Sequence, residues 1–318
     1  MKKLITAFIA TTLTLLSLPA YSAGLKNTTD VPTLAILDTA LDTSIPSIKS
    51  KLIGEVCILD LSPKDTPSCP NNTLFMEGPG AAVLPTTILS NRDFNHGTQM
   101  TSVAIKNNPN MNILFVRIVG NRSDGTRQST TVNTIPKALK WIYENQSKYN
   151  IKAVSMSQGN HNLLNSINYC PVTNVDYWVD WLYKSGIPVF FPAGNGRDYQ
   201  RIDWPACVPA SIAVGGAEDF GSSGFAISLT SNYDNKLIDF WTPMASQVTL
   251  PGNINGTAFG TSVAVQIAAA KWLSVSTIKS TLTQNQLIDL INKTGTPISN
   301  SSIKANGILL NADKAINN

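Results

Sequence analysis

The amino-acid sequence predicts an α/β protein with a doubly wound, mostly parallel sheet and helices on both faces. Short apolar runs without alternation, typical of strands buried on both faces, recur along the chain, and segments with helical spacing separate them. Strands that alternate with helices imply right-handed crossovers and such a sheet. The mature chain of about 300 residues is near the upper size for one core, so we expect one domain over residues 23–318.

The beginning of the sequence has the features of an export signal. Lys2 and Lys3 precede an apolar run over residues 5–18, and Ala20 and Ser22 put small residues where a signal peptidase reads. The run is shorter than the roughly 20 residues that span a bilayer, which disfavours a membrane anchor. We therefore expect a signal peptide over residues 1–22 and a mature protein that is secreted or periplasmic.

Local patterns predict the individual elements in order. Strands are expected at residues 33–37, 113–119, 151–156, 187–191 and 211–214. A helix is expected over residues 132–149, with a start near Thr134 because Pro136 is tolerated in a first turn. The last helices, at residues 263–273, 284–290 and 311–316, are joined by turns rich in Gly, Pro, Ser and Asn. They are expected to close the domain at its surface.

The chain has four cysteines, Cys57, Cys69, Cys170 and Cys207. An even number in a protein that leaves the cytoplasm favours two disulfides, for which three connectivities are possible. We prefer the pairing of nearest neighbours, Cys57 with Cys69 and Cys170 with Cys207. The alternative is four buried free thiols.

The charge is too small for a nucleic-acid-binding protein. The formal net charge is +4, and Lys2 and Lys3 leave with the signal peptide. Later apolar stretches have the lengths of buried strands and core helices rather than of membrane spans. The sequence therefore predicts that the protein does not bind nucleic acid and has no membrane anchor.

Polar residues follow two expected strands at their carboxyl ends, where ligands bind in sheets of this class. Asp38 directly follows the first strand, and Asn195 stands in the turn after the fourth. Asp42 is a rival carboxylate, but it lies four residues further along, so its position is less constrained. The simpler interpretations are an Asx turn at Asp38 and an ordinary Asn-Gly turn at Asn195.

A histidine and a serine stand where helices of small residues begin. His96 precedes Gly97, which lets a helix start at once with the imidazole facing outward. Ser262 opens an apolar helix, so its hydroxyl and amide lie at the positive end of that helix. Alone, each residue is more simply a helix cap or its neighbour. Together with Asp38 and Asn195, they are hard to explain by capping alone.

At these residues the chain resembles the subtilases, the subtilisin-like serine peptidases, over nearly all of its mature length. The chain order Asp38, His96, Ser262 is the order of the subtilisin triad. The similar segments are A-I-L-D-T at residues 35–39, H-G-T at 96–98, S-M-S-Q-G at 155–159, P-A-G-N at 192–195, W-P-A at 204–206, I-A-V-G at 212–215, G-T-S-V-A at 260–264 and N-G-I-L-L-N-A at 306–312.

The resemblance implies a serine endopeptidase that cuts peptide bonds through an acyl-enzyme. Ser262 would be the nucleophile, His96 the general base and Asp38 its partner carboxylate. Asn195 and the Ser262 backbone amide would hold the oxyanion. A peptide or protein substrate would lie against the residues that match the family's substrate-binding segments: Ser157, Gln158, Gly159, Pro192, Ala193 and Gly194.

The expected activity needs no cofactor or metal. Calcium is common in the family, yet no carboxylate-rich loop can be assigned to it here. Residues 23–32 are too few for a pro-domain, so the chain is similar to compact secreted subtilases such as the A subunit of subtilase cytotoxin. A delivery partner is possible, but the sequence does not identify one.

Two alternatives to a peptidase stay open. One is a catalytically silent subtilase-like protein that binds peptides or partners. The other, an unrelated secreted α/β esterase, fares worse because the chain lacks a Gly-x-Ser-x-Gly elbow and places its serine after its histidine. The second histidine, His161, could border the cleft, although a surface position in a loop is the simpler interpretation.

Overall fold

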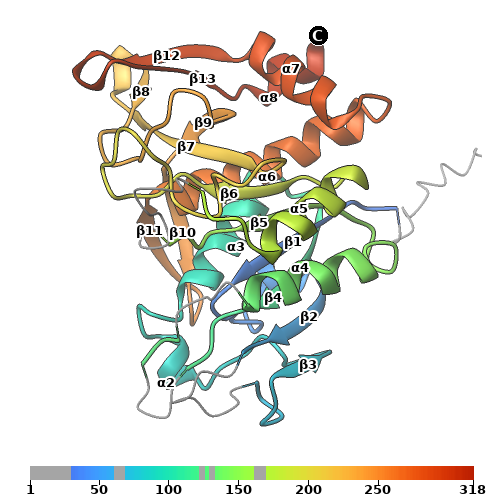
Figure 1. Cartoon of the computed structure of the whole chain (residues 1–318). Coiled ribbons are helices and arrows are strands. Elements are labelled where there is room, and N and C mark those ends of the chain that lie inside the picture. Colours follow the sequence, from blue (N-terminus) through green and yellow to red (C-terminus); the bar gives the residue numbers. More distant parts are fainter. Residues whose placement is uncertain (1–29, 61–68, 122–125, 129–132, 161–169) are drawn as a thin grey trace, which may run out of the picture.

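The computed structural model describes residues 30–60, 69–121, 126–128, 133–160 and 170–318. A large twisted sheet runs through the molecule, with helices on both of its faces (Figure 1). The expected signal peptide and His161 lie outside the described residues, so those two predictions are not addressed by the structure. Among the described residues, no helix is both long enough and apolar enough to cross a membrane.

Eleven strands of the described chain form one mixed, mostly parallel sheet, in the order β12-β13-β9-β7-β6-β5-β1-β4-β2-β3, with β8 beside β7. A separate hairpin is made by β10 and β11. The strands are β1 (Thr33–Asp38), β2 (Leu52–Ile58), β3 (Phe75–Glu77), β4 (Asn112–Arg117), β5 (Ile151–Met156), β6 (Val189–Pro192), β7 (Ile212–Asp219), β8 (Phe225–Ile227), β9 (Phe240–Pro243), β10 (Ala245–Leu250), β11 (Ile254–Phe259), β12 (Thr296–Asn300) and β13 (Ala305–Leu309). All five predicted strands are present, as β1, β4, β5, β6 and β7.

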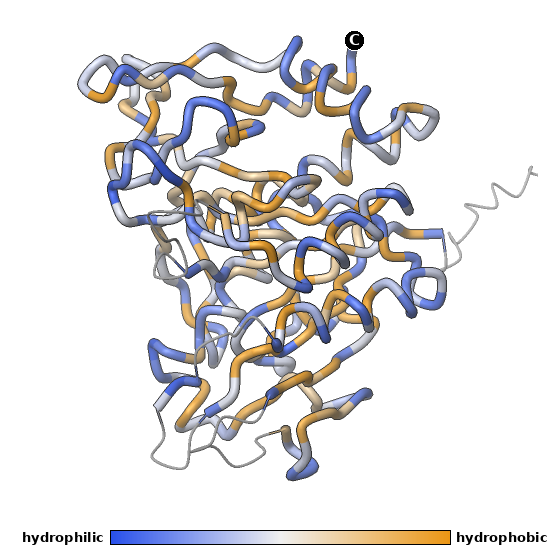
Figure 2. The backbone as a smooth tube through the Cα atoms, viewed as in Figure 1, coloured by the Kyte–Doolittle hydropathy of each residue, from blue (hydrophilic) through white to orange (hydrophobic). Residues whose placement is uncertain are grey.

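The central strands are apolar on both faces because helices cover both. In β1, Ala35 and Leu37 belong to the core shared with α4 and α5, whereas Leu34 and Ile36 belong to the core shared with α3 and α6. Figure 2 shows apolar residues along the central strands and polar residues in the outer loops. The helices are α1 (Pro46–Lys49), α2 (Thr86–Leu89), α3 (His96–Asn107), α4 (Thr134–Asn145), α5 (Asn174–Lys184), α6 (Thr261–Ile278), α7 (Gln284–Thr294) and α8 (Ala312–Asn317).

Helix α4 begins where its proline requires. Its first residue is Thr134, so Pro136 lies in the first turn, as predicted.

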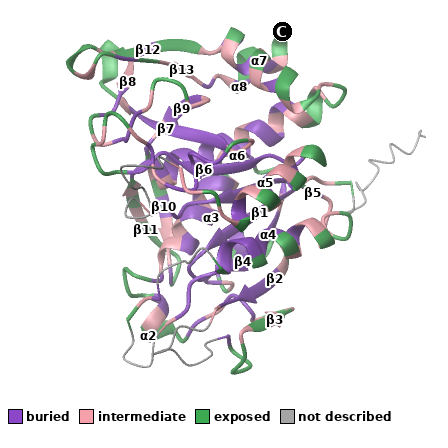
Figure 3. Ribbon diagram, in the orientation of Figure 1, coloured by how far each residue is buried: buried purple, intermediate pink, exposed green. Residues whose placement is uncertain are grey.

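The last three predicted helices also exist, but placing all of them at the surface was wrong for α6. This helix is apolar on nearly all sides and is buried against α3 and strands β5, β6, β7 and β9. Figure 3 shows α6 largely buried and α7 with exposed residues.

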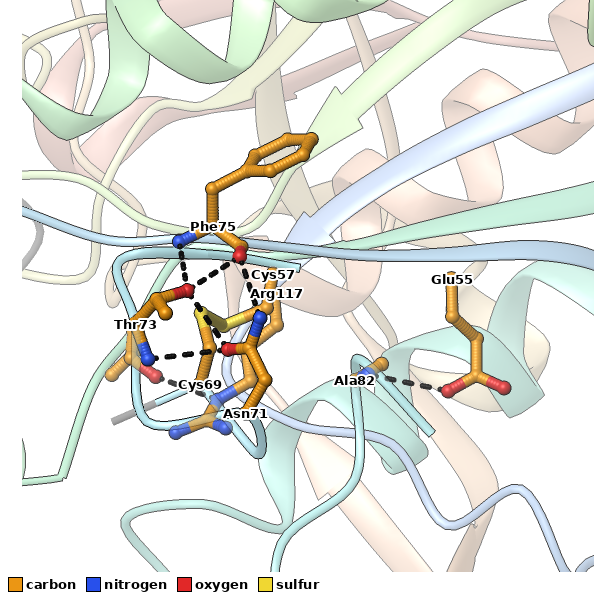
Figure 4. Close-up of a disulfide and its surroundings, with 9 residues drawn as sticks. Glu55, Cys57, Cys69, Asn71, Thr73, Phe75, Ala82 and Arg117 are labelled. Carbon is orange, nitrogen blue, oxygen red and sulfur yellow. Dashed lines mark hydrogen bonds between the residues drawn. A yellow bond between two sulfur atoms is a disulfide. The ribbon is translucent and has the colours of Figure 1, made fainter. Parts of the chain in front are cut away.

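Both disulfides expected from nearest-neighbour pairing are present, Cys57–Cys69 and Cys170–Cys207. The first joins the end of β2 to the turn before β3, beside the buried side chain of Arg117 (Figure 4). Within the described residues no cysteine is free. The pairing follows from the topology, because the antiparallel β2–β3 pair returns the chain to the end of β2.

Asp239, the residue directly before β9, has a carboxyl group whose protonation makes the stability of the fold depend on pH. The Asp239 carboxylate accepts a hydrogen bond from the backbone N of Ala213 at 2.8 Å. Burial raises the pKa of Asp239 from 3.8 to about 6, despite hydrogen bonds that favour the charged form. A raised carboxyl pKa contributes stability below pH 3.8, and that contribution is lost as the pH rises through 6.

We therefore expect Asp239→Asn to stabilise the protein at pH 8 and to change its stability little at pH 4. An asparagine oxygen can still accept from Ala213, but it carries no charge that burial penalises. The expected gain in unfolding free energy at pH 8 is about 1–3 kcal/mol. Urea unfolding of both proteins at the two pH values measures it. An equal gain at both values would contradict the assignment.

Candidate active site

The predicted site residues lie at one edge of the sheet, at the ends of neighbouring strands and at the starts of two helices. Strands β6, β5 and β1 are adjacent and parallel, so their carboxyl ends lie together. Asp38 is the last residue of β1, Ser157 directly follows β5, and Asn195 stands in the turn after β6. His96 is the first residue of α3 and Ser262 the second of α6, two helices that pack against each other.

Asp38 and His96 form the central contact of the site. His96 Nδ1 lies 2.8 Å from Oδ1 and 3.0 Å from Oδ2 of Asp38. Asp38 is fully buried, whereas 26% of the His96 side chain is exposed. A carboxylate accepts only, so Nδ1 carries the proton and Nε2 is left as the acceptor. This is the tautomer that a general base requires.

Thr39 and Gly97 hold α3 so that His96 reaches Asp38. Thr39 Oγ1 donates to the carbonyl of Phe94 at 2.8 Å and accepts from the Gly97 amide at 2.9 Å. A Cβ on Gly97 would lie 2.4 Å from the carbonyl oxygen of Ala40. Because that oxygen belongs to the backbone, only glycine allows the helix to start this close to the end of β1.

Asp42, the rival carboxylate, has a structural role. It accepts hydrogen bonds from the amide and hydroxyl of Ser44 and from the Gly252 amide, at 3.0, 2.5 and 2.7 Å. Burial raises the pKa of Asp42, but these hydrogen bonds outweigh burial and leave the pKa below its ordinary value. Asp42 therefore ties the turn between β10 and β11 to the loop after β1, and Asp38 is the carboxylate that contacts His96.

Ser262 bonds to the segment that follows β5. Its hydroxyl donates to the Ser157 carbonyl at 3.3 Å, and the Ser157 hydroxyl donates to the Ser262 carbonyl at 3.0 Å. In the described part of the chain, no hydrogen bond joins the Ser262 hydroxyl to His96. Catalytic hydrogen bonds are often long before substrate binds and tighten in the complex.

The Asn195 side chain is oriented by the helix that carries Ser262. Its Oδ1 accepts from the amide and the hydroxyl of Thr261, at 2.9 and 3.1 Å. Since these contacts fix the amide oxygen, the NH2 group is the donor available to a ligand. Gly260 makes room for this arrangement, because a Cβ there would lie 3.3 Å from Asn195 Nδ2. Asn195 is exposed, so the amide borders the surface.

Two glutamines link the site in ways that the sequence analysis missed. Gln158 is buried and donates from Nε2 to Asp38 Oδ1 at 3.3 Å, while Arg127 donates to its Oε1. Gln266 is fully buried, accepts from the Ser155 hydroxyl at 3.0 Å and donates to the Ser157 hydroxyl at 2.9 Å. The only sequence signal was a polar residue one turn after Ser262 in an apolar helix. Nothing local indicated the contact between Gln158 and Asp38.

The two expected substrate-binding segments lie next to each other. Residues 157–159 continue from β5, and residues 192–194 form the end of β6 and the turn after it. The two strands pair in parallel, with Ser155 opposite Phe190. Within the described residues, no group of three His, Cys, Asp or Glu side chains is placed to hold a metal ion.

Serine hydrolases of unrelated folds place their catalytic residues in different orders along the chain, and the order Asp, His, Ser on a doubly wound sheet is that of the subtilisins. The fold and the Asp38–His96 contact thus define a subtilisin-like protein. The chain belongs to the Subtilase family, whose family model matches residues 30–301.

Similar proteins support this assignment. Subtilisin NAT of Bacillus subtilis subsp. natto is 26% identical over 244 residues, and subtilisin E of Bacillus subtilis is 27% identical over the same length. These matches cover 72% of this chain but only 58% of the length of either subtilisin.

Solved structures share the fold at lower identity. A cold adapted subtilisin-like serine proteinase superposes with a TM-score of 0.63 at 19% identity, over 88% of each chain. Fervidolysin from Fervidobacterium pennivorans superposes with a TM-score of 0.69 at 14% identity, over 92% of this chain and 43% of that one.

Proposed function

We propose that this protein is an exported serine endopeptidase that hydrolyses peptide bonds through a Ser262-His96-Asp38 triad and an acyl-enzyme. The observation that carries the proposal is the contact of His96 Nδ1 with Asp38 at 2.8 Å, at the sheet edge where Ser262 opens α6. Membership of the Subtilase family supports the peptidase class. A catalytically silent binding protein is not favoured, because the sequence contains all four groups that the reaction needs. They are the side chains of Asp38, His96, Asn195 and Ser262.

In the proposed mechanism, His96 Nε2 removes the proton from the Ser262 hydroxyl as that oxygen attacks the scissile carbonyl. The imidazolium is stabilised by Asp38 and then gives its proton to the departing amine, which leaves an acyl-enzyme on Ser262. Water, deprotonated by His96, attacks the ester, and the acid product is released as the proton returns to Ser262. Asp38 stays ionised throughout.

Two donors would stabilise the oxyanion of each tetrahedral intermediate, the Asn195 NH2 group and the Ser262 backbone amide. The amide lies in the first turn of α6, where backbone N–H groups lack helical partners and the helix dipole favours negative charge. Asn195 is held by Thr261 in advance, so little reorganisation is needed when charge develops. The substrate would extend beside residues 157–159 as an added strand.

Removing the proposed oxyanion donor should lower kcat more than it changes KM. We expect Asn195→Ala to reduce kcat by about 100- to 1000-fold, the range known for the equivalent donor in a subtilisin. Asn195→Asp keeps an acceptor for Thr261 but loses the donor, so it should be at least as slow. Steady-state kinetics measure both variants. A normal kcat in either one would exclude Asn195 from the oxyanion site.

Export is supported by the disulfides. Cys57–Cys69 and Cys170–Cys207 use every cysteine of the chain, and such bonds persist in oxidising compartments. Together with the expected signal peptide, they favour a protein that acts in the periplasm or outside the cell.

A fluorophosphonate probe tests the proposed function directly. It should form a covalent adduct with the folded protein, and mass spectrometry should locate the adduct on Ser262. Ser262→Ala should not be labelled. A folded, oxidised wild-type protein that is not labelled would favour the silent binding protein instead.

A further inference from the structure

Gln266 is a buried polar residue that the proposed mechanism does not use. It lies on α6, about one helical turn after Ser262, between apolar residues of the helix, and it is fully buried. Moving an amide group from water into such surroundings costs free energy unless the group is hydrogen-bonded. A methionine would fill a similar volume without that cost, so packing alone does not explain an amide at this position.

The Gln266 amide joins α6 to the end of β5. Its Oε1 accepts from the Ser155 hydroxyl at 3.0 Å, and its Nε2 donates to the Ser157 hydroxyl at 2.9 Å. The Ser157 hydroxyl donates in turn to the Ser262 carbonyl at 3.0 Å. Both serines of the β5 segment are buried, so water competes little for these groups. A chain of hydrogen bonds thus runs from Ser155 through Gln266 and Ser157 to the backbone of the proposed nucleophile.

The Ser262 carbonyl sets the direction of this chain of hydrogen bonds. A carbonyl oxygen only accepts, so the Ser157 hydroxyl must donate its single proton there. The Ser157 oxygen must then accept from Gln266, which turns Nε2 toward Ser157 and Oε1 toward Ser155. Glutamine supplies the donor and the acceptor that this arrangement needs, whereas an ionised glutamate has no donor on its side chain.

We propose that Gln266 is a positioning residue that acts through Ser157 to hold the first turn of α6 against the segment after β5. This inference rests on the proposed peptidase function. Ser262 supplies both the attacking oxygen and one oxyanion donor, and residues 157–159 are proposed to bind the substrate. The contact between them therefore helps to set the distance from the nucleophile to the scissile carbonyl. Reacting atoms must lie about 3–3.5 Å apart, and a displacement of about 1 Å can cost about 100-fold in rate.

Gln266→Met tests the proposal, because it removes both hydrogen bonds of the amide at a similar side-chain volume. We expect kcat to fall by about 10- to 100-fold while KM changes by less than about threefold. Labelling of Ser262 by a small fluorophosphonate, which carries no peptide to bind residues 157–159, should slow by a similar factor.

Thr242→Val is the matched control for Gln266→Met. The Thr242 hydroxyl is also fully buried and donates to the Ala264 carbonyl, in the same first turn of α6, at 2.7 Å. It takes no part in the hydrogen bonds between Gln266, Ser157 and Ser262. Its loss should lower the urea midpoint of unfolding but leave kcat and the labelling rate at their wild-type values.

Ser157→Ala distinguishes a positioning role from a purely structural one. It removes the link between Gln266 and Ser262, so the double variant with Gln266→Met should be no slower than Ser157→Ala alone. Losses in kcat that multiply in the double variant would show that Gln266 does not act through Ser157.

Ser155→Ala is a milder variant, which serves if Gln266→Met does not fold. It removes the donor that orients the Gln266 amide, so kcat should fall by about 3- to 10-fold. A folded Gln266→Met or Ser155→Ala protein with wild-type kcat and labelling rate overturns the role of Gln266 alone. Absence of labelling in the wild-type protein overturns the peptidase function and this inference with it.

Discussion

Ser262→Ala is expected to lower kcat by about a millionfold, the scale known for loss of the catalytic serine in a subtilisin. The change removes the attacking oxygen but leaves the backbone amide of residue 262 in the first turn of α6. The Ser157 hydroxyl donates to the carbonyl of residue 262, which the variant retains, so the loop after β5 keeps that contact. The fold and the affinity for a peptide should therefore change little. Activity with the best peptide substrate and binding of a product peptide measure the two effects.

Ser274→Ala supplies the matched control for this experiment. Ser274 lies on the same helix, and its hydroxyl donates to the Ala270 carbonyl within the helix, at 3.3 Å. It should retain wild-type kcat. Residual activity of Ser262→Ala above about 1% of wild type, in a preparation free of other peptidases, would show that another group is the nucleophile.

The fold was predictable from the sequence where burial dominates. Strand β1 is covered on both faces, so most of its residues form an apolar run, and the same holds for β4 and β6, whereas the run of β5 is interrupted by the exposed Lys152. The strands β3 and β8 have three residues each and pair antiparallel with longer strands, so they were too short to predict, and β2 and β9 to β13 were not predicted either. Helix α6 was found but was expected at the surface with the other two final helices, although its apolar residues continue around the helix.

The site was predictable where chemistry coincides with a strand or helix end. Asp38, His96 and Asn195 stand at such ends and could be named before any contact was known. Gln158 and Gln266 could not be assigned their contacts, because their partners, Asp38 and Ser155, are distant in the sequence. A side chain whose role depends on long-range packing leaves no periodic or spacing signal in its own neighbourhood.

The contacts of Asp38 show why its two oxygens are not equivalent. Oδ1 accepts from the Thr39 amide at 2.7 Å and from Gln158 Nε2 at 3.3 Å, besides its contact with His96. Oδ2 lies 3.0 Å from His96 Nδ1. Thr39 and Gln158 thus present donors to one side of the carboxylate, while the other side faces only the imidazole among the contacts described.

This asymmetry predicts the effect of Asp38→Asn. The new carbonyl oxygen should take the Oδ1 position, because Thr39 and Gln158 both donate there, which leaves the NH2 group facing His96 Nδ1. A proton on Nδ1 would then face the NH2 group at 3.0 Å as well as the carbonyl oxygen at 2.8 Å, which favours the tautomer with its proton on Nε2, and that tautomer cannot remove a proton from Ser262. We expect kcat to fall by about 10⁴-fold with little structural change, as for the same change in another serine peptidase.

The tautomer can be observed separately from the rate, because the chain has only two histidines. Nitrogen-15 spectra, assigned with the help of His161→Gln, should show the His96 proton on Nδ1 in the wild-type protein and on Nε2 in Asp38→Asn. Asp42→Asn is the matched control: it should weaken stability, since Asp42 holds the β10–β11 turn at Gly252, but it should leave kcat and the His96 tautomer unchanged. A slow Asp38→Asn variant with its proton still on Nδ1 would refute the tautomer argument, because Asp38 would then act through the charge that it gives the imidazolium.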